Sequence, residues 1–135
     1  MSSPGITDVI SIKGDEYFTR IEDAETIAQH IVRPMNVWLP FNDKGSAFEI
    51  VLKKHGHKVF CTDGDFFETD PPQGINAVIS NPPFSRKKEV VQRLDSLNIK
   101  YALIVPFLFL NDGVPFDYAN QFMFFRKRMH FFMGG

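Results

Sequence analysis

The sequence predicts an α/β protein with a mostly parallel central sheet and helices on both faces of that sheet. Short apolar runs with strand character alternate along the chain with segments in which apolar residues recur every three or four positions. Two of the runs end in a turn rich in Gly, Pro, Asn or Asp before a helical pattern begins, which is the arrangement of a βα unit. The length of 135 residues is typical of a single domain. We therefore expect a flexible lead-in over residues 1–14 and one domain over residues 15–135.

The individual elements follow from this alternation in chain order. Apolar residues at helical spacing from Ile21 predict the first helix, which Pro34 ends. A second helix ends at Gly56, because glycine readily takes the left-handed cap conformation. Ser85 is placed to cap a later helix whose apolar face runs to Leu97. The other expected elements are strands over 37–41, 58–61, 77–80 and 101–105, a helix over 47–54, and strand-like segments over 121–125 and 129–132.

Composition and charge narrow the class of protein. The formal net charge is −1, so the molecule as a whole does not attract nucleic acid, and any such contact requires a local basic patch. One cysteine excludes an internal disulfide framework, and we interpret Cys61 as a buried apolar residue and not as a nucleophile. His55 and His57 lack an accompanying ligand cluster, so no metal site is expected. With no apolar run of membrane-spanning length, we expect a soluble, cytoplasmic protein in a reducing compartment, without membrane contact.

One stretch near the middle of the chain combines a buried strand with a stiff polar corner. Residues 77–80 read as the strand, and Asn81, Pro82, Pro83 and Phe84 follow at once. Proline ends a central strand because it has no N–H for the ladder, and it holds the residue before it extended. The Asn81 side chain and the Pro82 carbonyl offer oxygen acceptors, and Phe84 offers a flat ring. Because open α/β sheets bind ligands at the carboxyl ends of strands, this corner suits a planar substrate with an exocyclic –NH2 group.

The tetrapeptide Asn81-Pro82-Pro83-Phe84 resembles the catalytic Asn-Pro-Pro-aromatic segment of S-adenosylmethionine-dependent amino methyltransferases. These enzymes act on adenine in DNA or RNA, and a related branch acts on glutamine side chains. The order of the motifs is similar to that of adenine-specific members with C-terminal target recognition. This order is a Phe-Thr pair, a glycine loop, an Asp-Phe-Phe segment and then this tetrapeptide. The resemblance implies a Rossmann-like methyltransferase fold, compact and with truncation left open, in the cytoplasm of a bacterium or a phage-infected host cell. A subset common among phage proteins is matched at Trp38, Pro40, Phe41, Ser46 and Phe48.

The resemblance also implies which residues perform the chemistry. Asn81 and Pro82 would accept the two amine hydrogens, and Phe84 would stack on the target base. Without the resemblance, the glycine loop is an ordinary βα turn and residues 65–67 are an acidic turn with two core phenylalanines, and these alternatives stay open. The implied cofactor is S-adenosylmethionine, bound by Phe18 and Thr19 at its methionine end, by Pro40, Phe41, Asn42, Gly45 and Ser46 in the loop, by Asp63 at the ribose, and by Asp65 and Phe66 at the adenine.

Two basic clusters are candidate contacts for nucleic-acid phosphates. One lies on the helix that follows the tetrapeptide, and the other is the run Arg126-Lys127-Arg128 near the C-terminus. The alternative is that the first cluster is a solvated helix face. The residues assigned to substrate binding are Ser85, Lys87, Lys88, Arg126 and Arg128.

The expected activity is transfer of a methyl group from S-adenosylmethionine to the exocyclic amine of adenine in DNA or RNA. No separate target-recognition domain follows the tetrapeptide, so we expect recognition to depend on a protein partner or a second subunit, or to be non-specific. Two alternatives stay open. The chain is a catalytically degenerate methyltransferase fold that binds nucleic acid or a protein, or it methylates a protein glutamine, whose carboxamide also presents –NH2.

Overall fold

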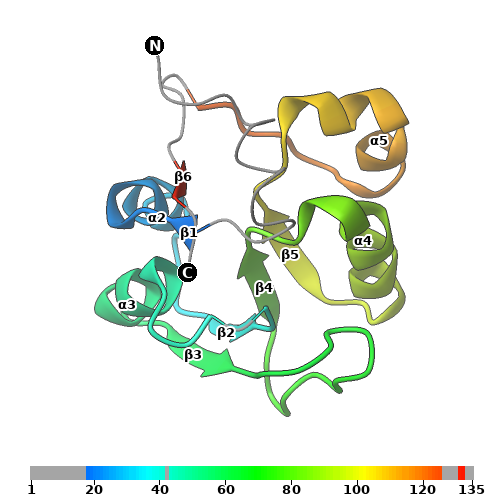
Figure 1. Ribbon diagram of the computed structural model, residues 1–135. Coiled ribbons are helices and arrows are strands. Elements are labelled where there is room, and N and C mark those ends of the chain that lie inside the picture. The colour runs from blue at the N-terminus through cyan, green and yellow to red at the C-terminus, as the bar shows by residue number, and fades with distance from the viewer. Residues whose placement is uncertain (1–17, 42, 126–130, 133–135) are drawn as a thin grey trace.

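Four short strands form one parallel sheet in the order β3-β2-β4-β5 (Figure 1). The computed structural model describes residues 18–41, 43–125 and 131–132. Each neighbouring pair in this sheet is parallel, so the expected α/β class and parallel sheet are confirmed. The strands are β2 (Asn36–Leu39), β3 (Lys58–Cys61), β4 (Ala77–Ser80) and β5 (Lys100–Leu103).

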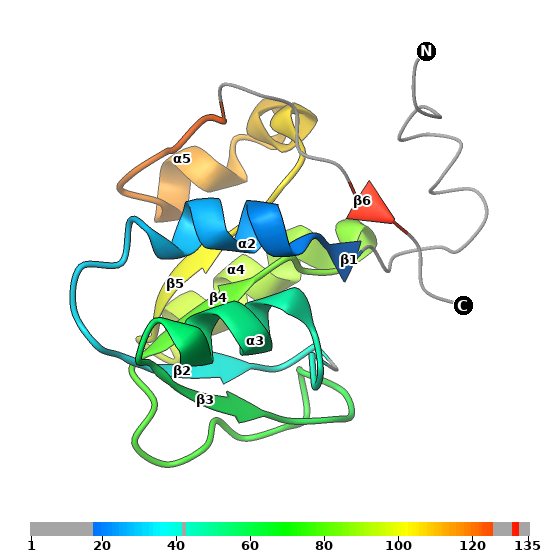
Figure 2. The same ribbon diagram turned by 90° about the vertical axis from the view of Figure 1, so that its left-hand side faces the viewer.

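A second, two-stranded sheet joins the two ends of the described chain. Strand β1 (Phe18–Thr19) pairs antiparallel with β6 (Phe131–Phe132), and Phe18 lies opposite Phe132. β1 also contacts helix α3 (Ala47–Lys54). Figure 2 shows both short strands beside the carboxyl ends of β2 and β3.

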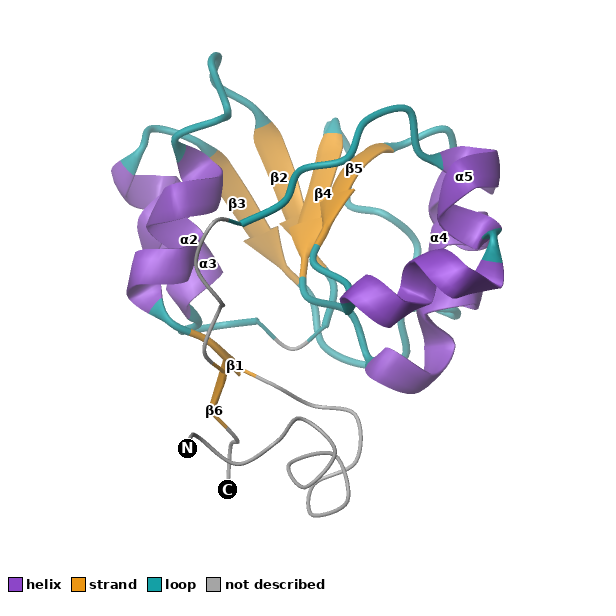
Figure 3. Ribbon diagram, turned by 90° about the horizontal axis from the view of Figure 1, so that it is seen from above, coloured by secondary structure: helices purple, strands orange, loops and turns teal. Residues whose placement is uncertain are grey.

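Helices cover both faces of the main sheet (Figure 3). Successive side chains of each strand point to opposite faces, so the central strands β2 and β4 have apolar residues that pack on both layers of helices. Helices α2 (Ile21–Ala28) and α3 lie on one face, where their apolar residues pack on Val37, Leu39 and Ile79. Helix α4 (Lys87–Ser96) lies on the other face and packs on Trp38 and Val78. The second layer continues through the 3-10 helix η2 (Phe107–Asp112) and the helix α5 (Val114–Tyr118), which pack on α4.

Several expected bounds are confirmed. Strands β3 and β4 and helix α3 have the predicted limits. Gly56 has φ +90° and ends α3 as expected. All four residues of β4 are buried, as a central strand requires, and the strand stops at Ser80, directly before the Asn-Pro-Pro corner.

Other expected bounds are wrong. Helix α2 ends at Ala28, well before Pro34, because its last turn tightens through bonds from His30 N to Ile27 O and from Ile31 N to Ala28 O. Strand β5 begins one residue earlier than expected and ends at Leu103. Residues 121–125 form no strand.

The start of α4 also differs from the expectation. A 3-10 turn, η1 (Phe84–Arg86), precedes the helix, and Arg86 occupies the N-cap position without a side-chain cap. Ser85 is therefore not the cap of this helix. No helix in the described part of the chain is long and apolar enough to cross a membrane.

Candidate functional site

The order of the strands creates a topological switch point at the carboxyl ends of β2 and β4. From β2 the chain continues through α3 on one face to β3, whereas from β4 it continues through α4 on the other face to β5. Val37 lies opposite Ala77 and Trp38 lies opposite Val78, so the two strands are direct neighbours. The connections leave them in opposite directions, and this switch point is where open α/β sheets bind ligands.

The Asn-Pro-Pro corner lies at one side of this switch point. Asn81 is half-buried, Pro82 is buried and Pro83 is half-buried. Pro83 is extended, with φ −54° and ψ 134°, and its carbonyl accepts a bond from Arg86 N at 3.3 Å. The ring of Phe84 lies outside the described side chains. The structure thus places a stiff corner, in which the Asn81 Oδ1 atom is buried, at the end of the central strand.

The turn after β2 forms the other side of the switch point. Pro40 is fully buried, Phe41 is half-buried, and Asn42 lies outside the described residues. Asp43 closes the turn, because its Oδ2 accepts from Phe41 N at 3.1 Å and its carbonyl accepts from Ser46 N at 2.9 Å. Ser46 then caps α3 through a bond from Glu49 N to Ser46 Oγ at 3.3 Å.

Asp43 is a candidate site residue that the sequence interpretation missed. Burial raises the pKa of its carboxyl from 3.8 to about 6, against the opposing effect of the bond from Phe41 N. The nearby charge of Glu49 raises this pKa further. Carboxyl groups with a pKa raised by burial are common at functional sites. The sequence carried no turn signal for this bond, because the Asp43 carboxylate accepts from a residue two positions earlier, whereas in an Asx-turn it accepts from one two positions later.

Gly45 has a specific conformational role in this turn. Its φ is +79°, and a Cβ added there meets no atom within 4 Å, so glycine is needed for its backbone conformation and not for space. Its N–H donates to Glu49 Oε1 at 2.6 Å, and this bond, together with the pair to Lys53, lowers the pKa of Glu49. The Gly45 N–H is therefore engaged within the protein.

The segment after β3 lies against the same end of the sheet. Asp63 is exposed, and exposed Asp65 accepts from Phe67 N at 2.9 Å and so closes its own turn. Phe66 is only 3 % exposed, and its ring centroid lies 5.0 Å from that of Phe41 and 5.6 Å from that of Trp38. The structure thus places Phe66 in the core, as the interpretation of an acidic turn with core phenylalanines expects.

Two buried hydroxyl groups at or near this end of the sheet have no hydrogen-bond partner among the described residues. They are Thr19 Oγ1, in the strand that contacts α3, and Ser80 Oγ, in the residue before Asn81. A buried polar atom without a partner costs roughly 1–3 kcal/mol, so each such atom calls for an explanation. The ring of Phe18, beside Thr19, lies outside the described side chains.

The first basic cluster is arranged differently from the expectation. Lys87 is 9 % exposed and its Nζ lies 5.9 Å from the centroid of the Phe109 ring, so its place on an exposed basic face is wrong. The reason is register, because position 87 continues the buried helical stripe of Val90, Val91 and Leu94.

The other cations of this cluster have varied surroundings. Lys88 and Ser85 are exposed. Arg86 stacks on the Phe67 ring at 3.9 Å and pairs with Glu89 at 3.5 Å, and Arg93 donates to Thr69 O at 3.1 Å. Arg86 and Arg93 thus hold the 65–69 segment against α4. Arg126 and Arg128 lie outside the described residues.

The two histidines after α3 have structural partners. His57 is buried and its Nδ1 accepts from Met35 N at 3.1 Å, while His55 Nε2 lies 2.9 Å from Glu25 Oε1. Burial lowers the pKa of His57, which keeps the ring neutral and able to accept. Within the described residues, no three His, Cys, Asp or Glu side chains form a group that could hold a metal ion. Burial and the nearby Glu49 raise the pKa of Cys61 to about 11, so its thiol stays protonated.

Comparison of the chain with protein-family models, with curated proteins and with solved structures found no match in any of the three.

Proposed function

We propose that the switch point between β2 and β4 forms a crevice in which this chain transfers a methyl group from S-adenosylmethionine to the exocyclic amine of adenine in DNA or RNA, on a Rossmann-like methyltransferase fold. The main support is the position of Asn81 and Pro82 directly after the central strand β4, across from the turn that follows β2. A substrate held at the corner and a cofactor held at the turn would meet in this crevice. The target strand would be presented with the help of a protein partner or a second subunit.

The residues around the turn fit part of the cofactor. S-adenosylmethionine has a positively charged sulfonium and ammonium group and several hydroxyl groups, so carboxylates and hydroxyls suit it. The chain offers Asp43 and exposed Asp63 as carboxylates and the buried Thr19 hydroxyl as a polar partner. When bound, S-adenosylmethionine supplies an activated methyl group, so no metal is required by the chemistry.

The proposed role of the corner is to orient the amine. The lone pair of an adenine amine is delocalised into the ring, which makes the amine a weak nucleophile. Asn81 Oδ1 and the Pro82 carbonyl would each accept one amine hydrogen and so favour a tetrahedral nitrogen with its lone pair directed at the methyl group. Alignment of this kind, with fixed acceptors, accounts for large rate effects without a covalent intermediate. In duplex DNA, the base must first leave the stack, at a cost of a few kcal/mol.

Two observations favour a second candidate, a methyltransferase fold that binds a partner without catalysis. Gly45 N–H donates to Glu49, and Phe66 is enclosed by core rings. Both groups were expected to contact the cofactor, and both are engaged within the protein. Calorimetric titration with S-adenosylmethionine separates the two candidates, because the catalytic one requires saturable binding.

The catalytic role of the corner is tested by Asn81→Ala. We expect loss of adenine methylation, measured by mass spectrometry after incubation with mixed DNA and RNA, with S-adenosylmethionine affinity changed by less than about threefold. The matched control is Asn120→Ala, which removes an exposed amide from the loop after α5 and should leave methylation unchanged. Methylation by Asn81→Ala at the rate of the unmodified protein would contradict the proposed role. Methyl groups found only on protein glutamine would place the substrate in the other branch.

A further inference from the structure

A cavity of about 390 Å³ lies at the opposite end of the sheet from the proposed catalytic crevice. It is formed where the chain enters β2, β4 and β5, because residues 33–35, 75–76 and 98–100 directly precede or begin these strands. It is an open depression of the surface, because none of its lining residues is buried, and its volume is within the range of about 300–1,000 Å³ that is usual for small-molecule sites. Its lining residues are Arg33, Pro34, Met35, Ile75, Asn76, Asn98, Ile99 and Lys100.

The lining combines two cations with an apolar surface. Arg33 and Lys100 are exposed, and neither forms an ion pair or a side-chain hydrogen bond among the described residues. Met35, Ile75 and Ile99 are half-buried and supply the apolar part. No acidic side chain belongs to the lining, so the cations face no competing carboxylate within the cavity.

The polar groups of the cavity are held in place by the backbone. Asn76 N donates to Asn36 O and Asn76 Oδ1 accepts from Asn36 N, both at 2.9 Å, which fixes this side chain at the entrance to β4. Asn98 takes the left-handed conformation, with φ +57°, directly after the last turn of α4. Asparagine is one of the few residues that adopt this conformation readily. The Asn76 side chain and the Asn98 backbone are therefore positioned before any ligand arrives.

The C-terminal end of α4 opposes anion binding only weakly. A helix C-terminus has the equivalent of about half a negative charge, against two full positive charges from Arg33 and Lys100. The last carbonyls of α4 are also occupied, since Arg93 O, Asp95 O and Leu94 O accept from the N–H groups of residues 97, 98 and 99. Among the lining residues and the end of α4, positive charge therefore exceeds negative charge.

We propose that this cavity binds a small organic anion, with its phosphate or carboxylate group between Arg33 and Lys100 and an apolar or planar body on Met35, Ile75 and Ile99. The site is separate from the catalytic crevice, because it lies at the amino ends of the same strands. Its occupation is independent of whether the chain methylates anything.

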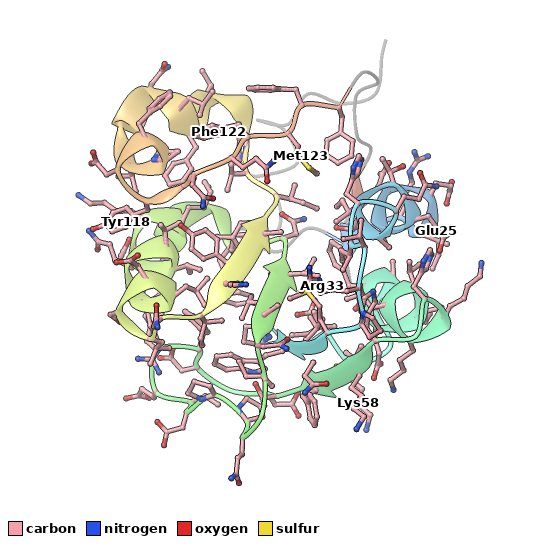
Figure 4. The ribbon with its side chains drawn as sticks, turned by 180° about the vertical axis from the view of Figure 1, so that it is seen from behind. Glu25, Arg33, Lys58, Tyr118, Phe122 and Met123 are labelled. Carbon is pink, nitrogen blue, oxygen red and sulfur yellow. The ribbon has the colours of Figure 1, made fainter. Side chains whose placement is uncertain are left out.

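Phenyl phosphate is a suitable probe because it joins an anionic group to a planar apolar body and does not resemble S-adenosylmethionine. We expect saturable chemical-shift changes at the amides of Ile75, Asn98 and Ile99 when it is titrated into labelled protein. Arg33→Gln and Lys100→Gln should each weaken binding about tenfold, as expected for loss of a charge-assisted hydrogen bond. The matched control is Lys58→Gln, because Lys58 is an exposed cation that lies on the same face as Arg33 (Figure 4) but does not line the cavity.

Binding that falls equally in Lys58→Gln would overturn the proposal, since it would show a general effect of charge. Phenol that binds as tightly as phenyl phosphate would overturn the anion requirement, and inorganic phosphate that binds as tightly would overturn the apolar part. Shifts confined to Gly45 and Ser46 would place the probe in the other crevice and would also contradict the proposal. Retained dispersion of the amide spectrum verifies that each variant is folded.

Discussion

Burial favours the uncharged form of both Asp43 and His57, but the two residues make the stability of the fold depend on pH in opposite directions. The pKa of Asp43 is raised from 3.8 to about 6, so the folded protein binds this proton more tightly than the unfolded chain does. That stabilisation is fully present below pH 3.8 and is lost as the pH rises through about 6. The pKa of His57 is lowered below 6.5, so its contribution is present above pH 6.5 and is lost as the pH falls.

Single substitutions should separate these two contributions. Asp43→Asn keeps an oxygen that can accept from Phe41 N but cannot carry a charge, so we expect it to be more stable than the unmodified protein at neutral pH. As the pH is lowered, the stability of this variant should fall more steeply than that of the unmodified protein. His57→Gln removes the contribution that His57 loses in acid, so this variant should lose less stability than the unmodified protein as the pH is lowered. Urea unfolding from about pH 4 to 8 measures both, and parallel curves for all three proteins would contradict the assignments.

The residue scale also shows what the sequence could not indicate at the candidate site. The Asn-Pro-Pro corner was predictable, because proline restricts the backbone wherever it occurs. The sequence left core packing and cofactor contact open for Phe66, and the difference is made by packing on Trp38 and Phe41, which are distant in sequence. The contact of Lys87 with Phe109 was not predicted, because it joins α4 to a segment distant in sequence. The elevated pKa of Asp43 likewise results from enclosure by its neighbours.

At the scale of the elements, local signals were reliable where several agreed. Helix α3 begins after a Ser46 cap, with Glu49 three residues on, and ends at Gly56, so both ends were specified locally. Helix α2 has no side-chain cap at its start. Its apolar pattern continues past its end to Val32, which is 88 % exposed, and this continuation extended the prediction too far. At α4, the 3-10 turn η1 places Arg86 at the N-cap position that was predicted for Ser85.

The turn between β2 and α3 gives a prediction at this scale. Gly45→Ala should destabilise the protein by about 1 kcal/mol, because a left-handed conformation costs a non-glycine residue about 1–2 kcal/mol and the change reduces unfolded-state entropy in partial compensation. Gly74→Ala is the matched control, since Gly74 has φ +86° and similar open space. Urea unfolding should give similar losses for both. A loss above about 3 kcal/mol for Gly45→Ala alone would show that the turn contributes more than its backbone conformation.

At the scale of the whole molecule, the parallel sheet separates two cores. Val51 packs with the residues of α2 and α3, and Val90 packs with Trp38 and Val78 on the opposite face. The alternation of strands and helices was enough to predict this architecture. The order of the strands, which creates the switch point, was not predictable in the same way, because it depends on long-range pairing such as that of Trp38 with Val78.

Double substitutions test this separation. Val51→Ala and Val90→Ala should each cost about 2 kcal/mol, and their effects should add to within about 0.5 kcal/mol because the two residues share no packing partner. Val78→Ala with Val90→Ala is the comparison pair within one core, where the effects should depart from additivity. Denaturant unfolding provides the free energies. Strong coupling between Val51 and Val90 would contradict the description of two separate cores.

The pairing of β1 with β6 has a consequence for the connectivity of the chain. Because Phe18 lies opposite Phe132, the first and last described residues are neighbours in space. A short linker from residue 132 to residue 18 would close the backbone into a ring, and new ends could be opened at exposed Gln73 and Gly74, between β3 and β4. Such a circular permutant would retain the strand order and both cores, and its new termini would lie at the end of the sheet opposite the Asn-Pro-Pro corner.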